Sequence, residues 1–396
     1  MKYKAFFYSL LIAGWLSGCV TEYDAPVSNQ LDNLLVVEGI ITNGTTTISL
    51  SRSVGLSGDV QKSQPVDLAR VWVENEAGLR FESSTVNNGQ YTIPTGELDY
   101  SVRYRLRISL GGDEYETDFL EFRTTSPIEE INLYQKESGN PVQVRINTSG
   151  AEGQSPYYFW SYEEIWETHA HQMATHYLGI EGNYTDYYSY GYVTYTLNRR
   201  YQDFIQEYDT YSPYYICWKY DNSKSLLLGS NDKLTENRIT NHVLYEVEPT
   251  DDRFSYLYYV KIKQYSLSED AYNYFNNLKK NAEDIGSIFS PVPSEMRGNI
   301  VCTTNPDIPV IGYVEASETE IKERFIRSGE TPYTKTHTCD ILTGAGDIPE
   351  TQLFDFYLFF YDQEASEQKW TNLPCIDCRS TGGTKIKPDF WPNDHI

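Results

Sequence analysis

Residues 104–110 read Tyr-Arg-Leu-Arg-Ile-Ser-Leu, with an apolar side chain at every second position. Because successive side chains of a strand point to opposite faces, this alternation predicts a β-strand with one buried and one solvated face. Gly111-Gly112 then supplies a turn into a second predicted strand, 115–123. The two segments together predict a β-hairpin.

The same pattern of short strands and turns extends back to residue 34. Turn residues such as Asn43-Gly44 and Asn88-Gly89 separate five further predicted strands, at 35–41, 46–50, 70–74, 79–83 and 90–93. Seven short strands within about ninety residues are typical of an immunoglobulin-like or transthyretin-like β-sandwich. We therefore predict a sandwich domain over residues 31–125, with a boundary near Thr125-Ser126-Pro127.

Residues 126–396 are predicted to form a larger β-rich domain with one or two helices. Strand patterns occur at 142–146, 157–166, 225–228, 243–247, 254–264, 310–316 and 353–360. One helix is expected near 268–284, since Ser268 can cap its start, acids follow in the first turn and Lys279-Lys280 lies near its end. The whole chain is therefore expected to be mainly β.

The N-terminus has the order of features that directs export. Lys2 and Lys4 precede an apolar run, 5–16, which is long enough for a signal peptide and too short to span a bilayer. We expect residues 1–18 to be this signal peptide and to be removed. A buried helix with a stray cysteine behind it is the alternative interpretation.

The apolar run ends in Leu16-Ser17-Gly18-Cys19, which matches the bacterial lipobox. In that motif small residues fit the lipoprotein peptidase and the cysteine thiol carries diacylglycerol. We expect lipid on Cys19 to anchor the protein, 19–30 to form a flexible tether, and no protein segment to lie inside the membrane.

The charge of the mature chain limits its partners. Removal of residues 1–18 takes Lys and Arg from 32 to 30 against 56 acids, so the net charge changes from −24 to −26. Such a chain repels nucleic acid phosphates and anionic headgroups, which argues against binding either through a basic surface. Cations and basic partners are not excluded by this charge.

Five cysteines are left after Cys19 is lipidated: Cys217, Cys302, Cys339, Cys375 and Cys378. Export permits disulfides, although an odd count leaves at least one thiol unpaired within the chain. Cys375-Ile376-Asp377-Cys378 could be redox-active, but Pro374 precedes it and a Gly382-Gly383 turn follows, which favours a structural disulfide role over redox or zinc chemistry. A direct bond between Cys375 and Cys378 would close a very small ring, so each is expected to pair with a distant cysteine.

No motif in the sequence points to catalysis or to a cofactor. The zinc protease helix, the serine nucleophile turn and the phosphate-binding glycine loop are all missing from it. His169, His171 and His176 lie close together, yet in a strand His176 would face away from the other two, so a hydrated surface is favoured over a metal site. A hydrolase with an unrecognised carboxylate site is a further alternative.

Tyrosine is the compositional outlier, at 35 of 396 residues, and it crowds the stretch 184–215 among Asn, Asp, Ser and Gly. This mixture is typical of paratopes, where tyrosine offers a large rigid surface with a polar tip. Ordinary β packing is the equally weighted alternative. The candidate contact residues are Tyr187, Tyr188, Tyr190 and Tyr192.

The chain resembles a known family at several points. Cys375-Ile-Asp-Cys378, Gly382-Gly383 and the Lys-Pro-Asp-Phe-Trp run at 387–391 resemble the ending of a Bacteroidetes lipoprotein family, the domain of unknown function 4249. Further agreeing stretches follow in order at 264–268 with Ala271-Tyr272, at 286–289 with Pro293, at 298–300 and at 311–313. The resemblance covers nearly the whole mature chain and brings no catalytic residues with it.

The resemblance implies an outer-membrane lipoprotein, facing the cell exterior, whose gene usually lies beside that of a TonB-dependent receptor. It gives counterparts to Cys217, Cys339, Cys375 and Cys378, which are expected to form two disulfides, and it leaves Cys302 as the extra cysteine. We therefore expect a non-enzymatic binding partner of a TonB-dependent nutrient transporter. A cell-surface adhesion or structural protein is the second candidate.

Overall fold

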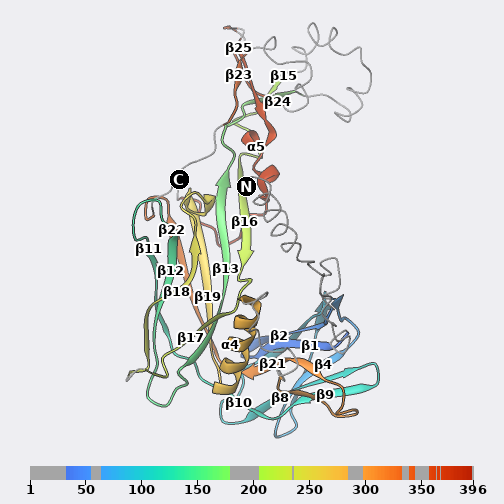
Figure 1. Cartoon of the computed structure of the whole chain (residues 1–396). Coiled ribbons are helices and arrows are strands. Elements are labelled where there is room, and N and C mark those ends of the chain that lie inside the picture. Colours follow the sequence, from blue (N-terminus) through green and yellow to red (C-terminus); the bar gives the residue numbers. More distant parts are fainter. Residues whose placement is uncertain are drawn as a thin grey trace, which may run out of the picture.

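The computed structural model describes residues 33–54, 64–178, 205–233, 236–283, 298–331, 339–343, 356–362, 364–365 and 367–394. They form a mainly β protein in three parts (Figure 1). A first sandwich lies at one end, a taller second sandwich stands beside it, and a small unit, called the tip below, lies at the opposite end. The predicted signal peptide, Cys19 and the tether fall outside the described residues.

The first sandwich consists of two sheets. Their strand orders are β21-β1-β2-β7-β6, with β3 beside β2, and β20-β9-β8-β4-β5, with β10 beside β8. The strands within the predicted domain are β1 (Leu35–Ile41), β2 (Gly44–Arg52), β3 (Gln64–Pro65), β4 (Arg70–Asn75), β5 (Arg80–Glu82), β6 (Thr85–Asn87), β7 (Gln90–Gly96), β8 (Arg103–Leu110), β9 (Asp113–Thr117) and β10 (Leu120–Glu121). Each predicted strand overlaps one of them; the predicted strand 115–123 is broken into β9 and β10, and the short strands β3 and β6 were not predicted.

Strand β8 has the two faces that its alternation predicts. Tyr104, Leu106 and Ile108 are at most 2% exposed and lie in the core between the sheets. On the opposite face, Arg105 contacts Glu74 at 2.6 Å and Glu116 at 3.2 Å. The polar positions of β8 are therefore neutralised by acids from the strands on either side.

Two strands far along the chain complete the first sandwich. β21 (Val310–Ala316) pairs in parallel with β1, and β20 (Ile300–Cys302) pairs antiparallel with β9. Val314 is fully buried in the same core. The first sandwich is therefore not made from residues 31–125 alone, because the chain returns to it after building most of the second.

The second sandwich packs a three-stranded sheet on a five-stranded one. The first has the order β11-β12-β18, and the second has the order β16-β13-β19-β22 with β17 beside β13. Their bounds are β11 (Ile128–Tyr134), β12 (Val142–Ser149), β13 (Tyr157–His169), β16 (Ile216–Asn222), β17 (Leu227–Ser230), β18 (Arg238–Val247), η3 (Asp252–Phe254), β19 (Leu257–Ser266) and β22 (Thr319–Arg327). The shared core includes the fully buried Val144, Trp160 and Tyr258.

Helix α4 (Glu269–Glu283) joins the two sandwiches, at the place predicted for it. The Ser268 hydroxyl accepts a hydrogen bond from the backbone N–H of Ala271 at 3.1 Å, which is a helix N-cap. Ser268 in turn donates to the buried Glu315 of β21 through its hydroxyl at 2.6 Å. The cap therefore ties the start of α4 to the first sandwich. In the described ranges no helix is both long and apolar enough to cross a membrane.

The tip is built from short elements beyond the end of β13 (Figure 1). β14 (His176–Leu178) pairs with β15 (Ile205–Glu207), and a three-stranded sheet has the order β23-β25-β24. The remaining bounds are β23 (Leu342–Thr343), β24 (Phe356–Asp362), β25 (Glu367–Asn372), α5 (Leu373–Ile376) and η7 (Cys378–Thr381). Four separate stretches of chain thus meet in this unit.

Candidate binding site

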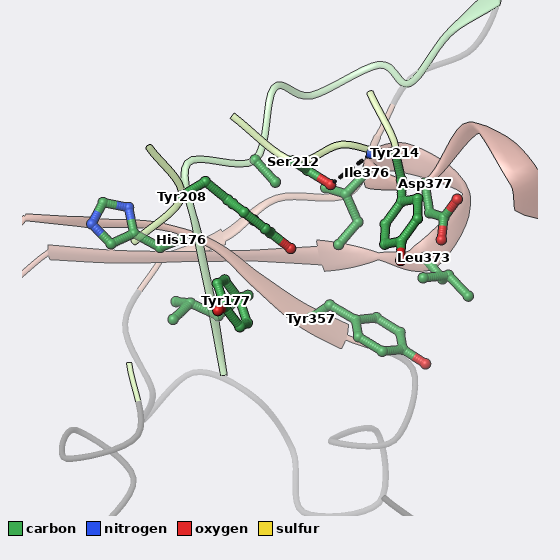
Figure 2. A pocket seen from close by; sticks show the side chains of 11 residues that line it. His176, Tyr177, Tyr208, Ser212, Tyr214, Tyr357, Leu373, Ile376 and Asp377 are labelled. Atoms are coloured by element: carbon green, nitrogen blue, oxygen red, sulfur yellow. Dashed lines mark hydrogen bonds between the residues drawn. The ribbon is translucent and has the colours of Figure 1, made fainter. Parts of the chain in front are cut away.

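A pocket of about 250 Å³ lies in the tip. Figure 2 shows Tyr208 reaching across it toward Tyr214, with Tyr177 and Tyr357 below them in this view. The full lining consists of Ala174, His176, Tyr177, Tyr208, Ser212, Tyr214, Tyr357, Leu358, Leu373, Ile376 and Asp377. The walls are therefore mainly aromatic and aliphatic, with few polar groups.

Backbone hydrogen bonds hold three of the lining segments side by side. The N–H of Ser212 donates to the carbonyl of Ala174 at 2.7 Å, and the N–H of Tyr208 donates to that of Thr175 at 2.8 Å. Thr175 donates its own N–H to the carbonyl of Phe359 in β24 at 2.9 Å. The pocket walls are thus positioned by main-chain bonds, which substitution of a lining side chain leaves in place.

The fourth lining segment contains Leu373, Ile376 and Asp377, and two disulfides hold it in place. Cys378 bonds to Cys217 of β16, and Cys375 bonds to Cys339. Each cysteine of the Cys-x-x-Cys pair thus has a distant partner, as the small-ring argument predicts, and Cys302 is a buried free thiol. The two residues between the paired cysteines, Ile376 and Asp377, line the pocket. This motif therefore acts as a scaffold that presents two side chains.

The charged groups at the pocket neutralise each other. Arg379 donates to both carboxylate oxygens of Asp377, at 3.0 Å from Nε and 2.7 Å from Nη2. The same guanidinium lies 3.4 Å from the ring centroid of Tyr214, which is cation–π geometry. The hydrogen bond to Asp377 raises the pKa of Arg379 further. Asp377 therefore offers the pocket no uncompensated negative charge.

Tyr208 is the most enclosed of the phenols at the pocket. Its ring stacks on that of Tyr177 with centroids 4.5 Å apart. Burial raises the pKa of Tyr208, against the opposing effect of a hydrogen bond with Ser212. Its hydroxyl is therefore uncharged at neutral pH and able to donate or accept a hydrogen bond.

The predicted tyrosine stretch is only partly described. Tyr187, Tyr188, Tyr190 and Tyr192 lie outside the described residues, so the structure says nothing of them. At the end of the stretch, Tyr208 and Tyr214 line the pocket, whereas Tyr215 packs beside Cys217 and Cys378. These last tyrosines thus divide between a pocket wall and ordinary packing, and the contact surface predicted at Tyr187, Tyr188, Tyr190 and Tyr192 stays a prediction.

The histidines differ from the hydrated surface expected for them. The His169 side chain is 4% exposed, stacks on Tyr256 with centroids 3.5 Å apart, and lies with Nε2 2.6 Å from the Glu167 carboxylate. The prediction was therefore wrong for His169, because the end of β13 is covered by aromatic rings. His176 lies at the pocket, where its Nδ1 accepts a hydrogen bond from the backbone N–H of Tyr361 at 3.3 Å. Among the described residues no group of three His, Cys, Asp or Glu side chains is arranged to hold a metal ion.

A second polar cluster lies inside the second sandwich. Glu164 is 1% exposed, accepts a hydrogen bond from the Tyr258 hydroxyl, and has Arg253 at 3.5 Å. Burial raises the pKa of Glu164, although the nearby Arg253 opposes the shift. Burial alone would raise the pKa of Asp252, but its ion pair with Lys219 at 2.7 Å and hydrogen bonds from Thr168 and Trp166 together lower it. One buried acid without a raised-pKa partner does not make the paired carboxylates of a glycosidase-type site.

The family stretches at 298–300 and 311–313 fix the joint between the sandwiches. The Asn299 side chain exchanges two hydrogen bonds with the backbone of Val314, at 2.7 and 2.9 Å. The Gly312 N–H donates to the Tyr274 hydroxyl at 3.0 Å, and a Cβ on Gly312 would lie 1.8 Å from the Val37 carbonyl oxygen. These residues therefore allow β21 to pack closely against α4 and β1.

The C-terminal stretch at 387–391 has a similar structural role. Trp391 is 3% exposed and donates from Nε1 to the Glu167 carboxylate at 3.0 Å. A Cβ on Gly383 would lie 2.6 Å from Cβ of Cys217, so this turn packs closely against the disulfide. The stretch thus fastens the C-terminal segment to the far end of β13 and to β16.

Sequence reasoning missed most of the pocket. Tyr357, Leu373 and Ile376 line it, yet nothing in their local sequence marks them as wall residues. The Cys-x-x-Cys spacing is the one signal that could have indicated Ile376 and Asp377, because cysteines with distant partners bring the residues between them to a junction.

A comparison with known protein families supports the family resemblance seen in the sequence. The family model described as Domain of unknown function (DUF4249) matches residues 20–323, which is more than half of the chain. A search of curated proteins finds no match. The matched range contains the first sandwich with Asn299 and Gly312, part of the pocket wall, and the second sandwich as far as Glu323 within β22. The chain belongs to the family of the domain of unknown function DUF4249.

Proposed function

We propose that this protein is a non-enzymatic, lipid-anchored binding protein of the outer membrane, facing the cell exterior, which docks on a TonB-dependent nutrient transporter through its tip. The observation that carries the proposal is the tyrosine-lined pocket held by two disulfides. Aromatic pockets of this kind favour binding, and both carboxylate oxygens of Asp377 are already bonded to Arg379.

The position of the pocket supports this role. The described chain begins at Asn33 in the first sandwich, and the tip lies at the opposite end of the molecule (Figure 1). The lipid expected on Cys19 would therefore connect to the first sandwich and not directly to the tip. The tip would then be available to meet a partner.

The class of partner comes from the family resemblance, in which such lipoproteins are encoded beside TonB-dependent receptors. The charge of −26 expected for the mature chain, 30 basic against 56 acidic residues, would favour a receptor surface of neutral or basic character. Electrostatic attraction of this kind chiefly speeds association, whereas the pocket would supply the lasting contact.

Co-purification tests the proposal. The full chain, tagged at its C-terminus, is expressed in its own host, solubilised from the outer membrane in mild detergent and captured. We expect the neighbouring receptor in the eluate, and at least about a tenfold loss when Tyr208 and Tyr357 are both replaced by Ala. Tyr134→Ala is the matched control, since Tyr134 is an exposed tyrosine of β11 in the second sandwich.

The thermal midpoint of each variant separates lost binding from lost folding. Absence of the receptor from the wild-type eluate would refute the docking role. If the pocket variant instead abolishes attachment of cells to other cells or surfaces while the receptor is unaffected, the adhesion alternative replaces it.

A further inference from the structure

We infer that the tip pocket receives one uncharged aromatic side chain from the partner protein. This inference rests on the proposed docking function and specifies its central contact. Four properties of the pocket support it: its size, its electrical neutrality, its walls and its rim.

The size of the pocket suits one side chain. A cavity of about 150 Å³ binds benzene, and pockets for drug-sized ligands begin at about 300 Å³. At about 250 Å³ the tip pocket falls between these limits. It therefore has room for one ring with a short attachment and too little for an intact drug-sized molecule.

The pocket also selects against charge. A cation would have to compete with Arg379, which already occupies both oxygens of Asp377 and lies over the Tyr214 ring. An anion would find Arg379 already paired with Asp377 and would meet the acidic chain as a whole. Desolvating either ion without a free counter-charge is costly, so an uncharged group is favoured.

The walls suit a ring. Tyr177 and Tyr208 form a stacked pair, and Tyr214 and Tyr357 contribute two more phenols. Aromatic rings bind one another in offset-stacked or edge-to-face pairs, which adds to the gain from burial alone. Because Tyr208 reaches across the pocket (Figure 2), its hydroxyl is placed to bond a polar group on the entering ring.

The rim indicates a protein as the source of that ring. Met173 is 48% exposed and Tyr211 is 37% exposed, and each immediately precedes a residue that lines the pocket. Ala174 and Ser212, which follow them, are hydrogen-bonded to each other through their backbones at 2.7 Å. Methionine and tyrosine are enriched at protein interfaces and adapt to a partner surface. Exposed apolar side chains next in sequence to lining residues, called the rim here, are expected where a side chain anchors a larger contact.

Probe binding tests the chemistry of the pocket directly. The full-length lipoprotein in lipid nanodiscs is titrated with 4-methylphenol, n-butylguanidinium and methyl glucoside, followed by saturation-transfer NMR, with empty nanodiscs as the blank. We expect 4-methylphenol to bind with a Kd of about 1 mM or below, and the cation and the sugar to bind at least about tenfold more weakly.

Two variants change the pocket in opposite ways. Ile376→Trp fills it, and Tyr208→Ala removes a wall; both should weaken 4-methylphenol binding at least about tenfold, while Tyr134→Ala leaves it unchanged. The thermal midpoint shows whether either variant has lost its fold. Equal binding to wild type and to folded Ile376→Trp protein would overturn the inference, as would a preference for the cation or the sugar.

Co-purification of the receptor with wild type and with the Ile376→Trp variant distinguishes this inference from the docking proposal. If the receptor co-purifies with wild type but about thirtyfold less with Ile376→Trp, the side-chain anchor is supported. If it co-purifies equally with both, docking stands and the anchor is refuted. If 4-methylphenol binds the pocket but no receptor is captured by wild type, the ligand is a free aromatic molecule, and the partner side chain is refuted together with the docking role.

Discussion

Removing the Cys217–Cys378 disulfide should release the tip while both sandwiches stay folded. The double variant Cys217→Ala, Cys378→Ala keeps chain length and charge, so the lost cross-link is its main effect. In the intact protein the bond closes a loop of sequence separation 161. When the whole second sandwich unfolds, closure of such a loop is worth about 5 kcal/mol in the chain-entropy model.

Local opening of the tip involves a shorter loop, because the sandwich strands on both sides stay in place. Cys217 lies on β16, and the last sandwich strand before Cys378 is β22, which ends at Arg327. The Cys339–Cys375 bond stays intact in the variant and shortens the free path from Arg327 to Cys378 to (339 − 327) + (378 − 375) = 15 residues plus the disulfide link. Closure of a loop of about 15 residues is worth about 3 kcal/mol, which corresponds to about a hundredfold change in the opening equilibrium.

Native-state hydrogen exchange measures this opening. Two reporters lie in the tip: the Cys378 amide, which donates to the Tyr214 carbonyl at 3.0 Å, and the Gly383 amide, which donates to the Cys378 carbonyl at 3.1 Å. We expect their protection to fall about a hundredfold, while that of β8 is unchanged. Cys302→Ala is the control, since it removes a buried thiol that has no disulfide. Tip protection within tenfold of wild type in the double variant would refute the reasoning.

Three further predictions concern the anchor, the joint between the sandwiches and alkaline pH. Cys19→Ala should abolish metabolic labelling with lipid, and unchanged labelling would contradict the anchor. Gly312→Ala places a Cβ 1.8 Å from the Val37 carbonyl oxygen and should cost about 3 kcal/mol or more in urea unfolding, whereas Gly139→Ala, which also has positive φ but open space around it, should cost about 1 kcal/mol. Burial raises the pKa of Tyr162 to about 12 from its usual value near 10, so its contribution to stability is full below pH 10 and is lost as pH rises to 12. Tyr162→Phe should flatten that fall in a series of urea midpoints from pH 9 to 12, and an unchanged slope would count against the assignment.

Local sequence patterns predicted many elements of the fold, although not β11, β16, β22 or β25. The alternation in β8 depends on neighbouring residues alone, and the start of α4 is marked by a serine and two acids within three positions. The same patterns say nothing about which strands pair. β21 was predicted as a strand, but its parallel partner is β1, far away in sequence, and no local signal could reveal that contact.

The candidate site was harder to predict for a related reason. A strand can be predicted from the periodicity of its own residues, whereas a pocket forms from residues of several segments that are far apart in the sequence. Tyr208 was noticed because tyrosine is abundant around it, while Tyr357 and Leu373 come from segments with no unusual composition. The disulfides were the partial exception, since the ring-size argument required distant partners for Cys375 and Cys378.

The dependence of the pocket on those disulfides follows from how little the tip can bury. Its described strands are two to seven residues long, and its walls come from four stretches of chain that share no large core of their own. Units of this size generally need cross-links, because conformational entropy outweighs the apolar area that they bury. Disulfides persist in oxidising compartments and are rare in the cytosol. A binding end built in this way would therefore function only after export, which agrees with the export signal predicted from Lys2, Lys4 and the lipobox at Cys19.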